Sequence, residues 1–380
     1  MLNKGMIKVA FISVSHKSIS LVSTGGLETF AIYYLNQLKR SNYKITLFAA
    51  KETDLSLFPG IDFVDLFSLA DIQEVKDEDL ESKAFTLNYS MFQYASLAKV
   101  LKRKDEFDIV HFSCAQWYAA SILSQNTDKL IISTIHVNNL KENPLNYVLN
   151  NFKKTYLVNI SNFSSIPFSN YENRETVYNG IDLNLFPFQV SSDSYFGWLG
   201  RIAPAKGLKE ALLAAKKADI EFTASGPRDF AEYYQKEIVP LLDNKRKLIY
   251  PLDLKTKGKF LSSAKAILLP IQWEEPFGLV MIEAMACGTP VIAYNRGSVP
   301  EILRDGLTGF IIDPDDEDRP GKGGWIIKKQ GIEGLVEAIK RIGEIDRRAC
   351  REHVEVNFSV EKMVNGYEKV YETVIGKNKL

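Results

Sequence analysis

Short apolar runs alternate with amphipathic stretches along the chain, and this alternation occurs in two successive sets. The first set of runs lies at 7–14, 44–49, 107–112, 130–137 and 156–160. The second set lies at 195–200, 220–224, 247–250, 266–270 and 291–294. Because strands that alternate with helices form parallel sheets covered by helices on both faces, the pattern predicts an α/β protein with two doubly wound domains.

A length of 380 residues also favours two domains, since it exceeds what one hydrophobic core usually serves. Asn179–Asp182 and the polar stretch 191–194 lie between the two sets and predict the interdomain connection. We therefore place the first domain at 1–185 and the second at 186–358. A final helix over 359–374 is predicted to have one apolar face, made of Val360, Met363, Val364, Tyr367, Val370 and Tyr371.

The composition is that of a globular protein without a dominant charge. Lys plus Arg and Asp plus Glu are 47 each, so no basic field predicts nucleic-acid binding or membrane docking. The three cysteines lie in apolar or helical segments, which argues against a disulfide framework and favours a reducing cytoplasm. The apolar run at 6–14 is too short to span a bilayer and is read as the first strand.

The segment 274–290 sets a carboxylate, Glu283, in a helix that is otherwise apolar on every side. Such a helix belongs in the interior, where an ionised carboxylate needs hydrogen-bond donors. The hydroxyl groups of a ligand could supply them, and a structurally paired glutamate is the alternative. Glu275 lies eight residues earlier at the mouth of the same helix, about 12 Å away if those residues are helical. That distance is similar to the one between the two sugars of a nucleotide sugar.

Glu275, seven residues and Glu283, within the run Pro-Phe-Gly-Leu-Val-Met-Ile-Glu-Ala-Met-Ala-Cys-Gly-Thr-Pro-Val, resemble the signature of glycosyltransferase family 4. These are retaining enzymes of the GT-B fold. The segment 270–278, Pro-Ile-Gln-Trp-Glu-Glu-Pro-Phe-Gly, is similar to the branch with avilamycin-pathway and tetrahydrobiopterin glucosyltransferases. The resemblance implies two Rossmann-like domains that face a central cleft. It also implies that the first domain binds the acceptor, that the second binds the nucleotide sugar, and that the helix at 359–380 packs back onto the first.

Glycines after the first strand, Gly25 and Gly26, would let backbone N–H groups approach an anion at a helix N-terminus. A simple turn explains them equally well. The resemblance implies that Gly26 contacts the donor, that Gly25 and His16 belong to the acceptor or diphosphate loop, and that Glu28 caps the following helix.

Arg201 and Lys206 follow the strand at 195–200, and crevices beyond the carboxyl ends of parallel strands bind ligands in open α/β sheets. A guanidinium and an ammonium can neutralise a departing diphosphate without a metal. The alternative is two solvated surface cations, and the resemblance favours the phosphate role. Gly226 follows the strand at 220–224 and would permit close approach of a nucleotide, or make a turn.

The resemblance implies the remaining roles at the site. Glu275 would bind the hydroxyls of the donor sugar and Glu283 the ribose. The helix start at Phe277, Gly278 and Leu279 would hold the diphosphate. His136 closes the strand run 130–136 and would contact the transferred sugar, although a structural histidine is the default for such a position. His111 is expected to be structural or on the acceptor side.

The predicted reaction is the metal-independent, cofactor-free transfer of a hexose to an acceptor hydroxyl, with retained α configuration. UDP-glucose is the preferred donor because of the branch, and the acceptor is an unidentified small molecule, glycan or glycolipid. The acidic runs 77–79 and 316–318 imitate a metal clamp, but they are read as solvated loops because no apolar strand precedes them. The alternatives are a nucleotide-sugar 2-epimerase or sugar phosphorylase of the same fold, and a non-catalytic sugar-nucleotide-binding subunit.

Overall fold

The chain forms two compact units. The computed structural model describes residues 6–377 apart from 14–16, 23–24, 40–41, 73–82, 115–116, 126, 139, 152–153 and 316–323; at 72, 83–89, 92–93 and 377 it describes the backbone alone. Unit 1 comprises Met1–Gly180 and Val360–Leu380, and unit 2 comprises Ile181–Ser359. The division at 180/181 falls slightly before the boundary expected at 185/186.

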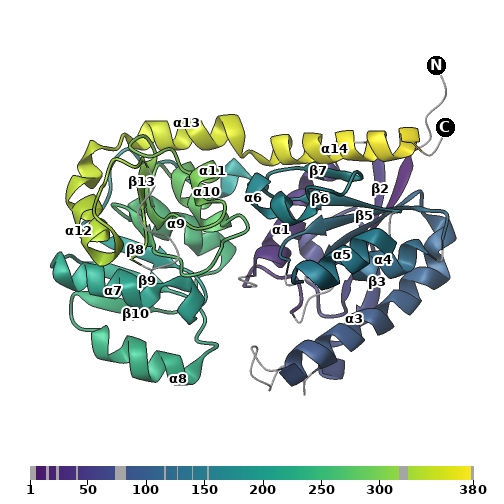
Figure 1. Ribbon diagram of the computed structural model, residues 1–380, viewed down its shortest axis with the longest axis horizontal. Helices are drawn as coiled ribbons and strands as arrows, with labels where there is room; N and C mark the ends of the chain where they lie inside the picture. The colour runs from purple at the N-terminus through teal and green to yellow at the C-terminus, as the bar shows by residue number, and fades with distance from the viewer. Residues whose placement is uncertain are drawn as a thin grey trace. The chain divides into compact units, whose positions relative to one another are not determined.

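Unit 1 is built on a seven-stranded parallel sheet in the order β3-β2-β1-β4-β5-β6-β7. Its strands are β1 (Ile7–Ile12), β2 (Tyr43–Ala50), β3 (Asp62–Phe67), β4 (Ile109–Cys114), β5 (Leu130–Ile135), β6 (Thr155–Asn159) and β7 (Arg174–Thr176). Its helices are α1 (Gly26–Leu38), α3 (Lys83–Arg103), α4 (Ala119–Ser124), α5 (Glu142–Asn151), α6 (Asn162–Ser165) and α14 (Val360–Lys377) (Figure 1). The central strand β4 is buried throughout, including its polar residues His111 and Ser113.

Unit 2 has a six-stranded parallel sheet in the order β10-β9-β8-β11-β12-β13. Its strands are β8 (Phe196–Leu199), β9 (Phe222–Ser225), β10 (Arg246–Ile249), β11 (Ile267–Leu269), β12 (Val291–Tyr294) and β13 (Gly309–Ile312). Its helices are α7 (Leu208–Lys217), α8 (Ala231–Tyr233), α9 (Leu254–Ser263), α10 (Leu279–Ala286), α11 (Val299–Ile302), α12 (Gly331–Arg341) and α13 (Arg347–Asn357). The strand order reverses between β8 and β11, which makes this pair the topological switch point of the sheet.

The predicted α/β architecture with two parallel sheets is confirmed, but three strands were absent from the prediction. β3, β7 and β13 each lie at an edge of a sheet. β7 has the sequence Arg-Glu-Thr and is only partly buried, so it has no apolar run for a pattern to detect. β13 differs from β7, because all of its residues are buried, but it is only four residues long.

Helix α14 belongs to unit 1, where it packs against α1 (Figure 1). All six residues of its predicted apolar face are buried. A buried chain of hydrogen bonds joins the helix to the sheet: Tyr371 contacts Tyr34 and His111, and Tyr367 contacts Thr134. Thr134 in turn lies 2.7 Å from Nε2 of His111. This helix therefore completes the core of unit 1.

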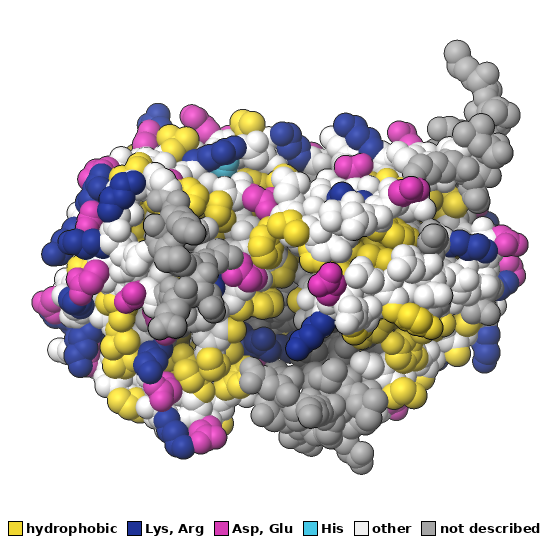
Figure 2. Space-filling view, in the orientation of Figure 1, with side chains coloured by type: hydrophobic (Ala, Val, Ile, Leu, Met, Phe, Trp, Pro, Cys, Tyr) yellow, Lys and Arg dark blue, Asp and Glu magenta, His cyan; other side chains and the backbone are white. Residues whose placement is uncertain are grey.

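The charged side chains of unit 2 are mixed in sign. On the face shown in Figure 2, Lys and Arg alternate with Asp and Glu over this unit. Many form surface ion pairs, such as Lys209 with Glu237 and Lys236 with Glu232. Across the described ranges, none of the helices combines the length and the hydropathy that a bilayer crossing requires.

Candidate functional site

The carboxyl ends of β8 and β11 bring several predicted residues together in unit 2. β8 leads into Arg201 and the 3₁₀ turn Pro204–Lys206, and β11 leads into the loop that carries Glu275. Because β8 and β11 are neighbours, these two loops meet at the switch point of the sheet. A backbone hydrogen bond of 2.9 Å from Gln272 N to Ala205 O ties them together. The structure thus places Lys206 and Glu275 side by side.

A charged cluster lies at the carboxyl ends of β8 and β11 and consists of Lys206, Glu275 and Trp273. Nζ of Lys206 lies 2.6 Å from Oε2 of Glu275, with the two side chains 26% and 10% exposed. The indole Nε1 of Trp273 donates to the same Oε2 at 3.0 Å. Lys206 Nζ also lies 4.7 Å from the centre of the Trp273 ring, within the range of a cation–π contact. The sequence predicts separate ligand contacts for Lys206 and Glu275, and it indicates neither their ion pair nor the hydrogen bond from Trp273.

Glu275 precedes the helix that carries Glu283, as expected, but the residues between the two carboxylates are not all helical. It lies in the loop before α10, which begins at Leu279 after the N-cap Gly278. Gly278 has φ +82°, a left-handed conformation that favours glycine, and it turns the loop into the helix. The estimate of a helical spacing between the two carboxylates is therefore wrong.

The loop after β12 contacts the backbone of Glu275 and Phe277. Ser298 N donates to the carbonyl of Glu275 at 2.9 Å, and Ser298 Oγ donates to the carbonyl of Phe277 at 2.9 Å. Gly297 has φ +56°, and a Cβ there would lie 2.2 Å from the carbonyl oxygen of Glu275. Only glycine fits this close approach, so the backbone of Glu275 is fixed by residues that follow the next strand.

Glu283 is 1% exposed on α10, as the apolar helix predicted. Its Oε1 lies 2.5 Å from Nζ of Lys257, whose side chain is 14% exposed and comes from α9. A lysine of the protein therefore neutralises this carboxylate, which is the structurally paired alternative considered above. The ribose contact of Glu283 stays a prediction.

The N-terminus of α10 offers backbone N–H groups at the same edge. The first turn includes Leu279 and Val280, both partly exposed, whereas Phe277 is buried. Free N–H groups and the helix dipole favour an anion there. At the other end of α10, Arg351 donates to the carbonyl of Ala286 at 2.8 Å, which satisfies a terminal carbonyl with a cation.

Arg201 is exposed, and its guanidinium lies 5.6 Å from the centre of the Phe230 ring. Gly226, at the end of β9, has a structural role that its turn position did not reveal. A Cβ on Gly226 would lie 1.6 Å from the carbonyl oxygen of Gly200, so the backbones after β8 and β9 touch at this point. The glycine thus serves close approach of protein backbone; its nucleotide contact stays a prediction.

In unit 1, Gly25 is the N-cap of α1 and makes no side-chain capping bond. The carboxylate of Glu28 lies over it, because a Cβ on Gly25 would be 1.9 Å from Oε2 of Glu28. Glu28 is 2% exposed, so it lies folded back over the start of the helix. A Cβ on Gly26 would meet no described residue within 4 Å. His16 lies outside the described residues.

His136 follows β5 directly, and Nε2 lies 2.9 Å from Oγ of Ser113 at the end of β4. Its ring meets the edge of Phe30 with centroids 4.8 Å apart. Burial lowers the pKa of His136 to about 3, so it is neutral at neutral pH. His111 is fully buried, and both of its ring nitrogens are hydrogen-bonded inside unit 1. Of the two roles expected for it, structural or on the acceptor side, these contacts fit the structural one.

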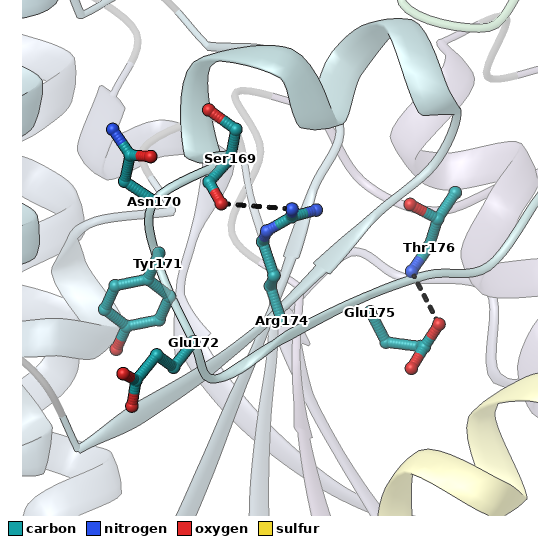
Figure 3. A pocket seen from close by; sticks show the side chains of 7 residues that line it. All are labelled: Ser169, Asn170, Tyr171, Glu172, Arg174, Glu175 and Thr176. Atoms are coloured by element: carbon teal, nitrogen blue, oxygen red, sulfur yellow. Dashed lines mark hydrogen bonds between the residues drawn. The ribbon is translucent and has the colours of Figure 1, made fainter.

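A polar hollow of about 380 Å³ lies elsewhere on unit 1. Its lining residues are Ser169, Asn170, Tyr171, Glu172, Arg174, Glu175 and Thr176, around β7 and the turn before it (Figure 3). The guanidinium of Arg174 donates to the carbonyl of Ser169 at 3.2 Å. This hollow contains none of the predicted site residues. Among the described residues, no group of three or more His, Cys, Asp or Glu side chains could hold a metal, and both acidic runs, 77–79 and 316–318, fall outside them.

Comparisons with known proteins agree with this geometry. The family described as "Glycosyl transferases group 1" matches residues 187–323, which lie within unit 2 and include both glutamates. Unit 2 is thus the part of the chain that is similar to the group 1 glycosyltransferases. Alpha-maltose-1-phosphate synthase of Mycobacterium tuberculosis is 28% identical over 185 residues, 46% of this chain and 47% of that protein. The chain therefore spans about half the length of this curated relative. Spore coat protein SA of Bacillus subtilis is 22% identical over 96% of this chain and 99% of that protein.

Solved structures share the fold. Sucrose-phosphate synthase from Thermosynechococcus elongatus aligns with a TM-score of 0.75 and 18% identity, over 98% of this chain and 100% of that one. HepE of Anabaena, solved in complex with UDP and glucose, aligns with a TM-score of 0.72 and 17% identity, over 97% and 100%. The chain thus has the GT-B fold, with two parallel-sheet, Rossmann-like domains.

Proposed function

We propose that this protein is a retaining, metal-independent glycosyltransferase that moves a hexose from a nucleoside diphosphate sugar to an acceptor hydroxyl. The observation that carries the proposal is the Lys206–Glu275 pair at the switch point, beside the N-terminus of α10. It sets cations and helix N–H groups, which suit a diphosphate, next to a carboxylate, which suits sugar hydroxyls. The resemblance to family 4, the match to the family of group 1 glycosyl transferases and the relative named as a synthase support the same class.

Departure of the diphosphate is the step that these cations would assist. Negative charge grows on the leaving oxygen as the bond to the anomeric carbon breaks, and fixed positive charge lowers the energy of that state. Lys206, Arg201 and the first turn of α10 would stabilise it. The acceptor oxygen forms its bond to the anomeric carbon on the same face, and its proton passes to the leaving phosphate oxygen. Atoms and charges balance without a protein nucleophile.

The other site residues would bind and orient the substrates. Glu275 would accept hydrogen bonds from the hydroxyls of the transferred sugar, and Glu283 from the ribose. His136 of unit 1 would contact the transferred sugar as a neutral hydrogen-bonding group. Gly25 and Gly26 would belong to the diphosphate and acceptor loop. Glucose from UDP-glucose is the proposed donor, and the HepE structure, which holds UDP and glucose in the same fold, supports that choice.

A direct test combines UDP-glucose with pterins, lipid-linked sugars and simple glycosides in the presence of EDTA. We expect UDP release together with a product whose anomeric proton has the small coupling constant of an α-glucoside. A β-glucoside or a strict manganese requirement would contradict the proposal. Interconversion of the donor without acceptor would indicate an epimerase, phosphate-dependent cleavage a phosphorylase, and donor binding without turnover a non-catalytic subunit. We also propose a cytoplasmic location, which suits three buried cysteines that are not joined in disulfides.

A further inference from the structure

We propose that Trp273 is a positioning residue that decides which oxygen of Glu275 meets the transferred sugar, and that it thereby sets the requirement for one sugar hydroxyl. This inference rests on the proposed function, because it assigns Glu275 to the donor sugar. It concerns a residue to which the predicted set of site residues gives no role.

The first observation is that both protein donors contact the same oxygen of Glu275. Oε2 receives the indole N–H of Trp273 at 3.0 Å and the ammonium of Lys206 at 2.6 Å. Within the described part of the chain, no donor contacts Oε1. The carboxylate is therefore turned so that one oxygen is occupied by the protein and the other is left for a ligand.

The second observation is that the indole also holds Lys206. The ammonium lies 4.7 Å from the centre of the Trp273 ring, so the same side chain supports the ammonium through its face and the carboxylate through its edge. The backbone of Lys206 is held separately, since Trp198 Nε1 donates to its carbonyl at 3.2 Å. Trp273 thus fixes the side-chain ends of the pair, where ligand contacts would be made.

The chemical consequence concerns hydrogen-bond polarity. An ionised carboxylate oxygen accepts hydrogen bonds and donates none, so Oε1 would select a sugar with a hydroxyl at the contacting position. Glu275 is 7% exposed, and a donor that covers Oε1 without supplying that hydroxyl would leave this oxygen without a hydrogen-bond partner. If Trp273 cannot donate, the carboxylate can rotate, and the preference for the hydroxyl should weaken.

The test uses Trp273→Phe, which keeps an aromatic face and removes the N–H. Trp325→Phe is the matched control, because its Nε1 donates to Oδ1 of Asp313 at the same 3.0 Å within unit 2. Calorimetry measures the affinity for UDP, for UDP-glucose and for UDP-glucose analogues deoxygenated at each sugar position. We expect Trp273→Phe to leave UDP affinity unchanged and to lower the affinity for UDP-glucose about 10- to 100-fold, the range for one hydrogen bond to a charged group.

In the wild type, the analogue that lacks one particular hydroxyl should bind much more weakly than UDP-glucose, and in Trp273→Phe this difference should shrink. Trp325→Phe should preserve it. Equal losses of UDP and UDP-glucose affinity, or an unchanged preference for the hydroxyl, would overturn the assignment to Trp273. Failure of the proposed function would look different, because the wild type would then bind the sugar nucleotide without transferring or would not bind it at all. In the latter case Trp273 has no sugar to select, and the inference falls with it.

Discussion

The hydroxyl of Tyr371 lies 2.8 Å from Nδ1 of His111, so the C-terminal helix is hydrogen-bonded to a central strand of unit 1. Tyr34 donates to Tyr371. The proton of Tyr371 is then directed at Nδ1, and His111 carries its own proton on Nε2, which faces Thr134. This order satisfies each member of a buried polar chain, which is the condition under which such networks stabilise a core.

Substituting Tyr371 by Phe should lower the free energy of unfolding by about 2–4 kcal/mol, because it leaves two buried polar groups without partners. Urea denaturation followed by circular dichroism would measure the change. Tyr147→Phe is the control, since Tyr147 is 68% exposed on α5. A loss no larger than that of the control would show that the hydrogen-bond chain does not stabilise unit 1.

Acid should destabilise the protein through two histidines, the fully buried His111 and the partly buried His136. Burial lowers the pKa of His111 and of His136 to about 3, whereas an unfolded histidine titrates near 6.5. Between these values the unfolded state binds more protons, so stability is full above about pH 6.5 and is lost as the pH falls towards 3. Each histidine should contribute a loss of about 1.4 kcal/mol at pH 5.5. Urea midpoints at pH 7.5, 6.5 and 5.5 would measure this loss of stability. His136→Asn should make the midpoint depend less steeply on pH. An unchanged pH dependence in this variant would contradict the contribution of His136.

Lys257→Met should be more damaging than the loss of a surface ion pair. It would leave the carboxylate of Glu283 buried without its counter-ion, at a cost of about 3–5 kcal/mol. The double variant with Glu283→Gln should recover most of that stability, because the uncompensated charge is gone. Lys236→Met removes a pair that is 69% and 79% exposed and should change little. Thermal unfolding of the wild type, Lys257→Met, the double variant and Lys236→Met would measure these differences in stability. A double variant as unstable as Lys257→Met would count against an effect of the buried charge.

Arg201→Ala should reduce turnover about 10²- to 10³-fold if its guanidinium stabilises the departing diphosphate. Arg341→Ala provides the comparison, because Arg341 lies 5.5 Å from the Phe310 ring centre in a similar stacked contact on α12. Initial rates of UDP release from UDP-glucose in EDTA would be measured for both. Near-normal rates in Arg201→Ala would remove it from the site, and stimulation by manganese would reopen the question of a metal.

The sequence was most informative where strands are central and apolar. The run 291–294 predicts β12 residue for residue, because a strand buried on both faces has no polar positions. Edge strands gave weaker signals, and β7 with its Arg-Glu-Thr sequence gave none. Local patterns report burial, and an edge strand is fixed by pairing with a neighbour that is distant in the chain.

The same limit applies to the site. The motif placed Glu283 in a buried helix correctly, since the apolar residues that surround it are its neighbours in sequence. Its partner Lys257 is 26 residues away on another helix and has no distinguishing pattern. The contact between Lys206 and Glu275 likewise arises from the adjacency of β8 and β11. Of the missed residues, only Trp273 had a signal, as it lies two positions before Glu275.

The placement of α14 has a consequence for synthesis on the ribosome. Residues 181–359 form unit 2, and they are translated before Val360–Val374, whose buried face completes the core of unit 1. Unit 2 can therefore close while unit 1 still exposes the rings of Tyr34 and Phe30 and the polar edge of His111. Although unit 1 is the first to be translated, it should finish folding after unit 2. A nascent chain stalled before residue 360 should bind chaperones more strongly than the full chain, because it exposes these core residues of unit 1.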